Sequence, residues 1–414
     1  MTRPSLLIAF FLMIVRYYDY AIFGLSAEIL SSNFLPIKEQ DTQLLLFFAI
    51  FGATVVAKPF GSIIFGFISD KYGRITSIKI SIFFATISTT LIGLTPEFNK
   101  VGIFATMILI FCRMAFLMSL AGESDTIKIY VAEKVGGKYR NYANGIVSFC
   151  SQVGVLLAAT TYHFSTELIN IPYLWRVNFL IGGVLGLFII FMRHFFQESE
   201  EFIKHQKKIS TKEIKFSDLV QILKNQKGKF TIALLINGCL GGVYHFLIIF
   251  WVVFIAKIAL IISSHDAKLM NMILIVIYAF MSLLSGFLAD KYNPKRQIII
   301  SLLLSILAVL ISSFFLSEAF SPIYFAMVCI TLTPLYNVPL QIIIQSIFDI
   351  NVRARMYSLS HSIGGMIFSS TTPFFCMLMW KYFHSLSLVL GFFLLLLLIL
   401  SSTVIYLYNN LVKN

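Results

Sequence analysis

The sequence predicts an all-α membrane protein in which twelve transmembrane helices form two pseudo-symmetric six-helix bundles. Three observations support this fold class: the composition, a series of long apolar runs and an internal repeat. Of the 414 residues, 58% are hydrophobic and only 12% are charged. A soluble domain carries about 25% charged residues. Most of the surface of this chain therefore cannot face water.

Twelve apolar runs follow one another along the chain. A membrane-spanning helix needs about 20 apolar residues, and each run is too long for a barrel strand. Helices also satisfy their backbone polar groups internally, which a bilayer requires. The first run has no cleavage site after it, so we expect an uncleaved span. The predicted spans are 6–30, 43–66, 76–95, 101–130, 142–165, 173–195, 229–256, 269–289, 297–316, 322–348, 357–380 and 386–409.

A short segment occurs once in each half of the chain, as Gly66–Tyr72 (GFISDKY) and as Gly286–Tyr292 (GFLADKY). Each copy follows the second predicted span of its half, in a predicted cytoplasmic loop. Two six-helix bundles related by an axis along the membrane normal are typical of one large class of transporters. We expect an N-terminal bundle at 1–196, a cytoplasmic linker with a short interfacial helix at 197–228, and a C-terminal bundle at 229–414.

The net charge of +13 could indicate a nucleic-acid partner, but the Lys and Arg residues lie mainly between the apolar runs. Positive loops mark the cytoplasmic side of a membrane protein. With the N-terminus inside, the cytoplasmic segments hold far more Lys and Arg than the outer ones. We therefore expect both termini in the cytoplasm and no nucleic-acid partner. Neither the cysteines nor the histidines have the spacing of metal ligands, so no metal or cofactor is expected.

The segment 66–74 (GFISDKYGR) resembles the signature loop of the major facilitator superfamily, and more of the chain resembles its metabolite:proton symporter branch. That branch includes proline/betaine, α-ketoglutarate and shikimate carriers. The resemblance implies a secondary transporter with the major facilitator fold. The matching segments are Tyr17–Gly24, Lys58–Gly61, Arg113 with Ala121–Glu123, Trp175–Arg176, Glu198–Phe202, Ile363–Gly365 and Thr372–Pro373.

Ionisable residues inside the predicted spans are the candidate substrate site. A charged side chain at the centre of a span costs about 2.5–3.5 kcal/mol on insertion, so it should face the bundle interior or water. Arg113 lies near the middle of the fourth span, and Lys58 lies in the inner half of the second. Arg16 and Asp19 share one face of the first span. We expect Lys58, Arg113 and Arg16 to bind a substrate carboxylate; alternatively, Arg16 and Asp19 only neutralise each other.

Proton coupling requires an acid whose surroundings change during transport. A low dielectric favours the neutral form of a carboxylic acid, and a nearby guanidinium favours the charged form. Asp19 is the first candidate because Arg16 can compete with the proton for it, and Glu123 is the second.

The two signature segments are predicted to act as a gate on the cytoplasmic side. Gly66 permits close helix packing, and Asp70 can cap a helix or pair with a basic group. The predicted gating residues are Gly66, Asp70, Lys71, Gly73, Arg74, Glu133, Arg140, Asp290, Lys291, Arg353 and Arg355.

The sequence thus predicts a secondary active transporter of the bacterial inner membrane that imports a small carboxylate-bearing metabolite or osmolyte with a proton. No set of catalytic residues indicates an enzyme, and the oligomeric state stays open. Two alternatives remain: a proton-independent facilitator or exporter, and a transport-inactive sensor or scaffold. The second is kept open by Arg16, where the branch usually has an acid, and by Asn293-Pro294 in place of Gly-Arg.

Overall fold

The computed structural model describes residues 3–36, 46–47, 49–50, 52–167, 173–192, 218–251, 263–314, 321–349 and 352–411. Among these residues, twelve helical segments are long and apolar enough to cross a membrane. The predicted all-α, twelve-span fold class is therefore confirmed. The chain divides into two compact units, which are described separately below.

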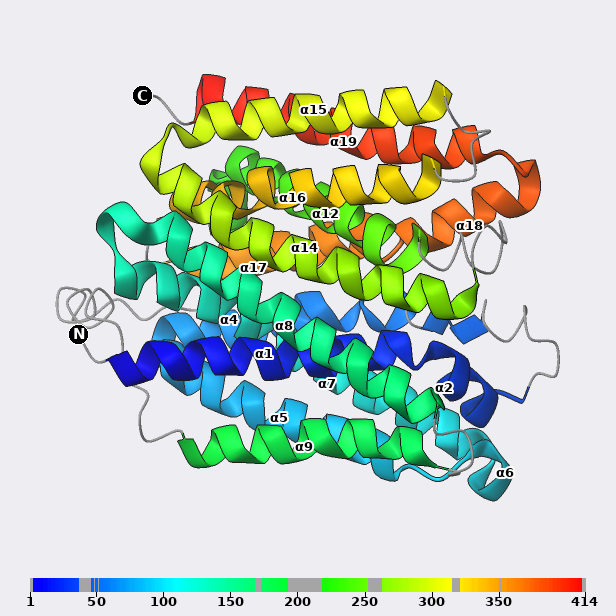
Figure 1. The fold of residues 1–414 in the computed structure, drawn as a ribbon. Coiled ribbons are helices and arrows are strands. Elements are labelled where there is room, and N and C mark those ends of the chain that lie inside the picture. Colours follow the sequence, from blue (N-terminus) through cyan, green and yellow to red (C-terminus); the bar gives the residue numbers. More distant parts are fainter. Residues whose placement is uncertain are drawn as a thin grey trace. The chain divides into compact units, whose positions relative to one another are not determined.

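Unit 1 comprises Met1–Lys134 and Cys150–Glu213. Within it, α5 packs against both α4 and α9, and α1 packs against α9 (Figure 1). A buried apolar core joins α1, α7, α8 and α9 through side chains such as Phe23, Leu109 and Phe179. Its helices are α1 (Arg3–Leu25), α2 (Ala27–Phe34), α4 (Ala57–Tyr72), α5 (Arg74–Leu94), α6 (Phe98–Val101), most of α7 (Ile103–Val135), most of α8 (Arg140–Glu167) and α9 (Leu174–Met192).

Unit 2 comprises Val135–Phe149, which includes the start of α8, and Ile214–Asn414. Here α16 packs against α14 and α15, and α12 packs against α17 and α19. Two π-helical segments, Phe246–Phe250 and Gly365–Ser369, continue α12 and α17. Its other helices are α11 (Asp218–Asn225), α12 (Lys227–His245), α14 (Ser264–Lys291), α15 (Pro294–Phe314), α16 (Ser321–Ser346), α17 (Arg353–Gly364), α18 (Thr372–Phe383) and α19 (Leu386–Asn410).

The predicted division of the chain at 196 and 229 stays a prediction. α11 places a short helix in the described part of the expected linker. Residues 197–217, which hold the rest of that linker, lie outside the described residues.

The first signature segment is helical rather than a loop, which corrects the expectation from the sequence. α4 continues to Tyr72 and α5 begins at Arg74, so Gly73 alone separates the two helices. Gly73 has a φ of 107°, a conformation that glycine adopts without steric cost. The chain therefore reverses within one residue.

At the second signature segment two helices are also joined by a short connection, but the residues that form it are different. α14 ends at Lys291 and α15 begins at Pro294. The Asn293 side-chain oxygen accepts a hydrogen bond from the Lys295 N–H at 2.9 Å. Asparagine is a favoured N-cap, and proline suits the first helical position because no N–H is needed there. Asn293-Pro294 is therefore a local helix start, although it departs from Gly-Arg.

Candidate functional site

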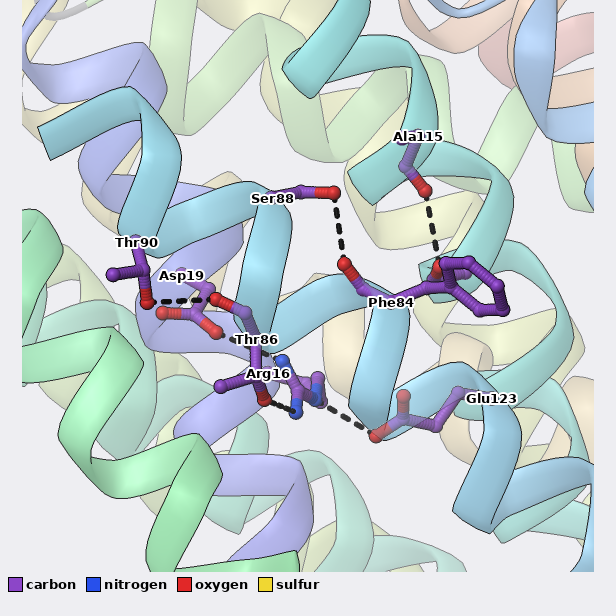
Figure 2. A network of polar contacts seen from close by, with 9 residues as sticks. Arg16, Asp19, Phe84, Thr86, Ser88, Thr90, Ala115 and Glu123 are labelled. Atoms are coloured by element: carbon purple, nitrogen blue, oxygen red, sulfur yellow. Dashed lines mark hydrogen bonds and ion pairs between the residues drawn. The ribbon is translucent and has the colours of Figure 1, made fainter. Parts of the chain in front are cut away.

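Arg16 and Asp19 of α1 and Glu123 of α7 form an ion cluster in the interior of unit 1. Arg16 Nη1 donates to Asp19 Oδ2 at 2.9 Å, and Arg16 Nε donates to Glu123 Oε1 at 2.8 Å (Figure 2). Arg16 Nη2 makes a longer bond, of 3.4 Å, to Thr86 Oγ1 on α5. The side chains of all three cluster residues are 0% exposed. One guanidinium therefore binds two carboxylates away from water.

Arg16 was predicted to bind substrate, and Asp19 and Glu123 were predicted to couple transport to protons. The structure brings the two coupling candidates, Asp19 and Glu123, together on Arg16, and it engages Arg16 with protein carboxylates. With both acids ionised, the cluster carries one net negative charge; after it takes up one proton, it carries none. Such a cluster can exchange a proton while its guanidinium keeps a charged partner, which a buried ion requires.

Glycines on α9 make room for the ion cluster. A Cβ at Gly182 would lie 2.0 Å from Asp19 Oδ1, and a Cβ at Gly186 would lie 2.2 Å from Thr86 Oγ1. Small residues let helix backbones approach closely inside membranes. Among the described residues, no group donates a hydrogen bond to Asp19 Oδ1. This oxygen is therefore an acceptor that a proton can use.

A second set of side chains in unit 1, the cation–ring site, holds Lys58 and Arg113 on aromatic rings. Lys58 Nζ lies 5.0 Å from the centroid of the Tyr20 ring, and the Arg113 guanidinium carbon lies 5.3 Å from the same centroid. The guanidinium is also 4.1 Å from the Phe23 ring and 5.5 Å from the Phe116 ring. Arg113 is buried, at 1% exposure, whereas Lys58 is half-buried. Two of the three predicted substrate cations thus lie close to one aromatic ring, that of Tyr20.

A close crossing of α4 and α7 fixes this cation–ring site. A Cβ at Gly61 of α4 would lie 2.0 Å from the backbone oxygen of Met118 on α7. One turn further, a Cβ at Gly122 of α7 would lie 2.0 Å from the Cβ of Phe65 on α4. Lys58 precedes Gly61 by less than one turn, so the crossing sets how far Lys58 lies from α7.

Tyr20 and Phe23 belong to the matching segment 17–24, but no role in holding cations was predicted for them or for Phe116. Tyr20 and Phe23 follow Arg16 at four and seven residues, so the three share one face of α1. That spacing was a signal for their common surface. Phe116, on another helix, gave no comparable signal.

The two signature segments repeat one local contact. Lys71 Nζ lies 5.5 Å from the Phe67 ring and 5.2 Å from the Tyr72 ring. Lys291 Nζ lies 5.7 Å from the Phe287 ring and 5.4 Å from the Tyr292 ring. Both lysines are exposed, and Gly66 is buried in α4. The side chains of Asp70 and Arg74 lie outside the described residues.

Asp290, in the second signature segment, caps the N-terminus of α8. Its Oδ1 accepts bonds from the Asn141 backbone N–H at 3.1 Å and from Asn141 Nδ2 at 2.9 Å. Its Oδ2 accepts a bond from the Tyr142 N–H at 2.7 Å. Gly286, one turn earlier, permits the approach, because a Cβ there would lie 2.5 Å from the Asn141 oxygen. A carboxylate at a helix N-terminus is favoured by the helix dipole.

The groups that bind Asp290 lie at the start of α8, beside the predicted gating residue Arg140. Arg140 is the first residue of α8, but the bonds to Asp290 come from Asn141 and Tyr142. The other predicted gating residues lie on two helices. Glu133 is buried on α7 and Arg355 is buried on α17, and Arg353, at the start of α17, donates from Nε to the Phe348 oxygen at 3.4 Å.

We expect Asp290→Ala to lower the stability of unit 2 by about 1.5–3 kcal/mol, the usual contribution of hydrogen bonds to a charged group. The measurement is the thermal midpoint of the purified protein. Asp266→Asn is the matched control, because Asp266 lies at the other end of α14 and bonds only locally to Ser263. An Asp290→Ala midpoint equal to that of the control would contradict the capping role.

Unit 2 holds a row of neutral polar groups along α16. Asn337 Nδ2 donates to the Tyr278 hydroxyl at 2.7 Å, and Gln341 Nε2 donates to Asn337 Oδ1 at 2.9 Å. Gln345 follows at the same four-residue spacing, which places the three amides on one helix face. We refer to Asn337, Gln341 and Gln345 as the amide row.

His245 lies where the two π-helical segments of unit 2 meet. Its Nδ1 is 2.8 Å from the Ser369 backbone oxygen and 2.6 Å from Ser369 Oγ. The contacts support a hydrogen-bonded histidine that ties α12 to the segment after α17.

The twelve apolar helices of the described residues are typical of a multi-pass membrane protein, and the buried ions of unit 1 are typical of a transporter. Residues 5–227 match the family model described as "Sugar (and other) transporter". The chain therefore belongs to the sugar (and other) transporter family, within the major facilitator superfamily. A solved structure of a proton:xylose symporter of that superfamily, bound to 6-bromo-6-deoxy-D-glucose, has the same fold. It superposes with a TM-score of 0.78 over 99% of this chain and 96% of that one, at 15% identity.

Two curated relatives are more similar to this chain in sequence than the solved symporter structure is. The proline/betaine transporter of Escherichia coli (strain K12) is 30% identical over 199 residues, which is 47% of this chain and 40% of that protein. The chain thus covers less than half the length of this relative. The citrate-proton symporter of Klebsiella pneumoniae is 23% identical over 364 residues, which is 86% of this chain and 80% of that protein.

Proposed function

We propose that this protein is a secondary active transporter that imports a small carboxylate-bearing solute together with a proton by alternating access. Two relatives are named for such solutes, as a proline/betaine transporter and a citrate-proton symporter. We further propose that the chain lies in a bacterial inner membrane with both termini in the cytoplasm.

One observation supports this function above the others: unit 1 holds two separate charged sites with different chemistry. The cation–ring site offers Lys58 and Arg113, which attract a carboxylate as a point charge and as a bidentate donor. The ion cluster offers two acids on one guanidinium. Solute and proton therefore have distinct binding groups, as a symporter requires.

Both sites are built on α1 and α7. Tyr20 and Phe23 of the cation–ring site lie on the same helix as Arg16 and Asp19, and Arg113 lies on the same helix as Glu123. A change of charge in the ion cluster can therefore alter the positions of the rings that hold the cations. We assign Asp19 and Glu123 to proton coupling, Lys58 and Arg113 to solute binding, and Arg16 to the ion cluster.

We propose that the signature segments act as the cytoplasmic gate. The support is the cap of Asp290 on α8, a contact that can break as a unit because all three of its bonds end on one carboxylate. Gly66, Asp70, Lys71, Gly73 and Arg74 would serve the corresponding role in the first copy.

The test is uptake by the purified chain in liposomes, with citrate, α-ketoglutarate, proline and glycine betaine as labelled solutes. We expect at least one carboxylate to accumulate above equilibrium under an inward proton gradient and only to equilibrate without one. Asp19→Asn should abolish gradient-driven accumulation because it removes the proton acceptor, while Glu97→Gln, in a part-exposed pair with Arg176, should retain it.

The other outcomes have definite meanings. Equal uptake with and without the gradient would indicate a facilitator, and gradient-driven uptake by Asp19→Asn would remove Asp19 from coupling. No flux of any of the four solutes would favour a transport-inactive sensor or scaffold.

A further inference from the structure

We infer that unit 1 selects organic anions that lack an ammonium group, over zwitterions such as proline or betaine. This inference rests on the proposed function and narrows its substrate class. The reason is that charged side chains of the protein already lie against the aromatic rings and carboxylates that could bind an ammonium group.

An ammonium ion is usually bound in proteins by aromatic faces, by carboxylates or by both. The aromatic rings of the cation–ring site are those of Tyr20, Phe23 and Phe116. The Arg113 guanidinium lies 5.3, 4.1 and 5.5 Å from their centroids. Since Arg113 is 1% exposed, a protein cation fills the position that a solute ammonium would take.

Three interior carboxylates of unit 1 already lie beside a cation of the protein. Asp19 and Glu123 both bind Arg16 at 2.9 and 2.8 Å. Asp125 Oδ1 lies 3.9 Å from Lys128 Nζ on the same helix. An ammonium that entered would compete for these carboxylates with a guanidinium or an amine that is covalently tethered nearby, and a tethered group competes at a high effective concentration.

The charge that remains near the rings is positive. Lys58 and Arg113 lie on the same Tyr20 ring, and like charges repel more strongly where the dielectric is low. No carboxylate of the described residues pairs with Lys58 Nζ. A bound anion relieves the repulsion of the two cations, whereas an ammonium adds a third positive charge. The half-buried position of Lys58 leaves its amine within reach of a solute.

The test uses pairs of solutes that have the same shape and differ in one positive nitrogen. Glycine betaine is compared with 3,3-dimethylbutanoate, proline with cyclopentanecarboxylate, and glutamate with glutarate. Affinity is measured by calorimetry on the detergent-purified full-length chain. We expect the member without the ammonium to bind at least tenfold more tightly in every pair that binds.

Two variants and a control locate the effect. Lys58→Gln should weaken binding of the preferred anion at least fivefold, and Arg113→Met should reduce the preference within a pair because it vacates the rings. Lys100→Gln is the matched control, since Lys100 also lies over a tyrosine ring, at 5.6 Å from Tyr173, but at an exposed position. It should bind like the wild type.

Failure of this inference can be told apart from failure of the proposed function. Tighter binding of the ammonium member, together with gradient-driven uptake of that solute, overturns the inference and leaves the symporter proposal intact. Preference for the anion with no flux of any carboxylate overturns the symporter proposal and supports the inference. Absence of binding by every member overturns the inference, and uptake in liposomes decides the symporter proposal separately.

Discussion

Replacement of Arg16 by glutamine should be among the most damaging single changes in this protein. The guanidinium binds Asp19 and Glu123 at the same time, and all three side chains are 0% exposed. Removal of one partner from a buried ion pair costs about 3–5 kcal/mol, because it leaves an uncompensated buried charge. We expect a strongly lowered thermal midpoint and a low yield of inserted protein.

A neutral version of the cluster is the sharpest companion variant. Arg16→Met combined with Asp19→Asn and Glu123→Gln removes every charge, so it should recover much of the stability while losing proton coupling. Arg176→Gln is the control in the same unit, since its pair with Glu97 is 3.6 Å long and part-exposed, and exposed pairs contribute about 0.2–1 kcal/mol. If Arg16→Gln were as stable as this control, the ion cluster would not stabilise unit 1.

The second large effect is expected at Gly61. A Cβ there would lie 2.0 Å from the Met118 oxygen and 2.5 Å from the Met118 Cα. These are backbone atoms that cannot rotate away, so α4 and α7 would have to separate. Overpacking of this kind costs about 1–3 kcal/mol. Gly61→Ala should lower the thermal midpoint and also weaken anion binding, because Lys58 would move away from α7.

Gly52→Ala is the matched control for this crossing. Gly52 begins the same membrane span, and a Cβ at that position would meet no atom within 4 Å. Its substitution should leave stability and anion affinity unchanged. Equal behaviour of the two alanine variants would contradict the close crossing.

Sequence reasoning located the spans because apolar runs report burial in lipid directly. It failed at the end of the second span, where Ser69, Asp70 and Lys71 lower the hydropathy while the helix continues to Tyr72. Helix termination there depends on the positive φ of Gly73 rather than on polarity. Local geometry also decides the helix start at Asn293-Pro294. This pair departs from the family pattern, but the Asn293 side chain caps the helix.

The candidate site could be predicted only in part. The shared helix face of Arg16 and Asp19 follows from their spacing of three residues, and the structure shows their ion pair. The bond from Arg16 to Glu123 joins residues 107 positions apart, so its existence depends on the packing of α1 against α7. The choice of partner for Arg16 is a tertiary property that no local pattern contains.

The amide row of α16 has a consequence for experiments on acidity. Carboxamides neither gain nor lose protons across the physiological range, so the donors and acceptors of Asn337, Gln341 and Gln345 stay the same on both sides of an energised membrane. Whatever these three side chains contribute is therefore constant when the external medium is acidified. If acidification changes the affinity for a solute, the group that takes up the proton is therefore a side chain outside the amide row.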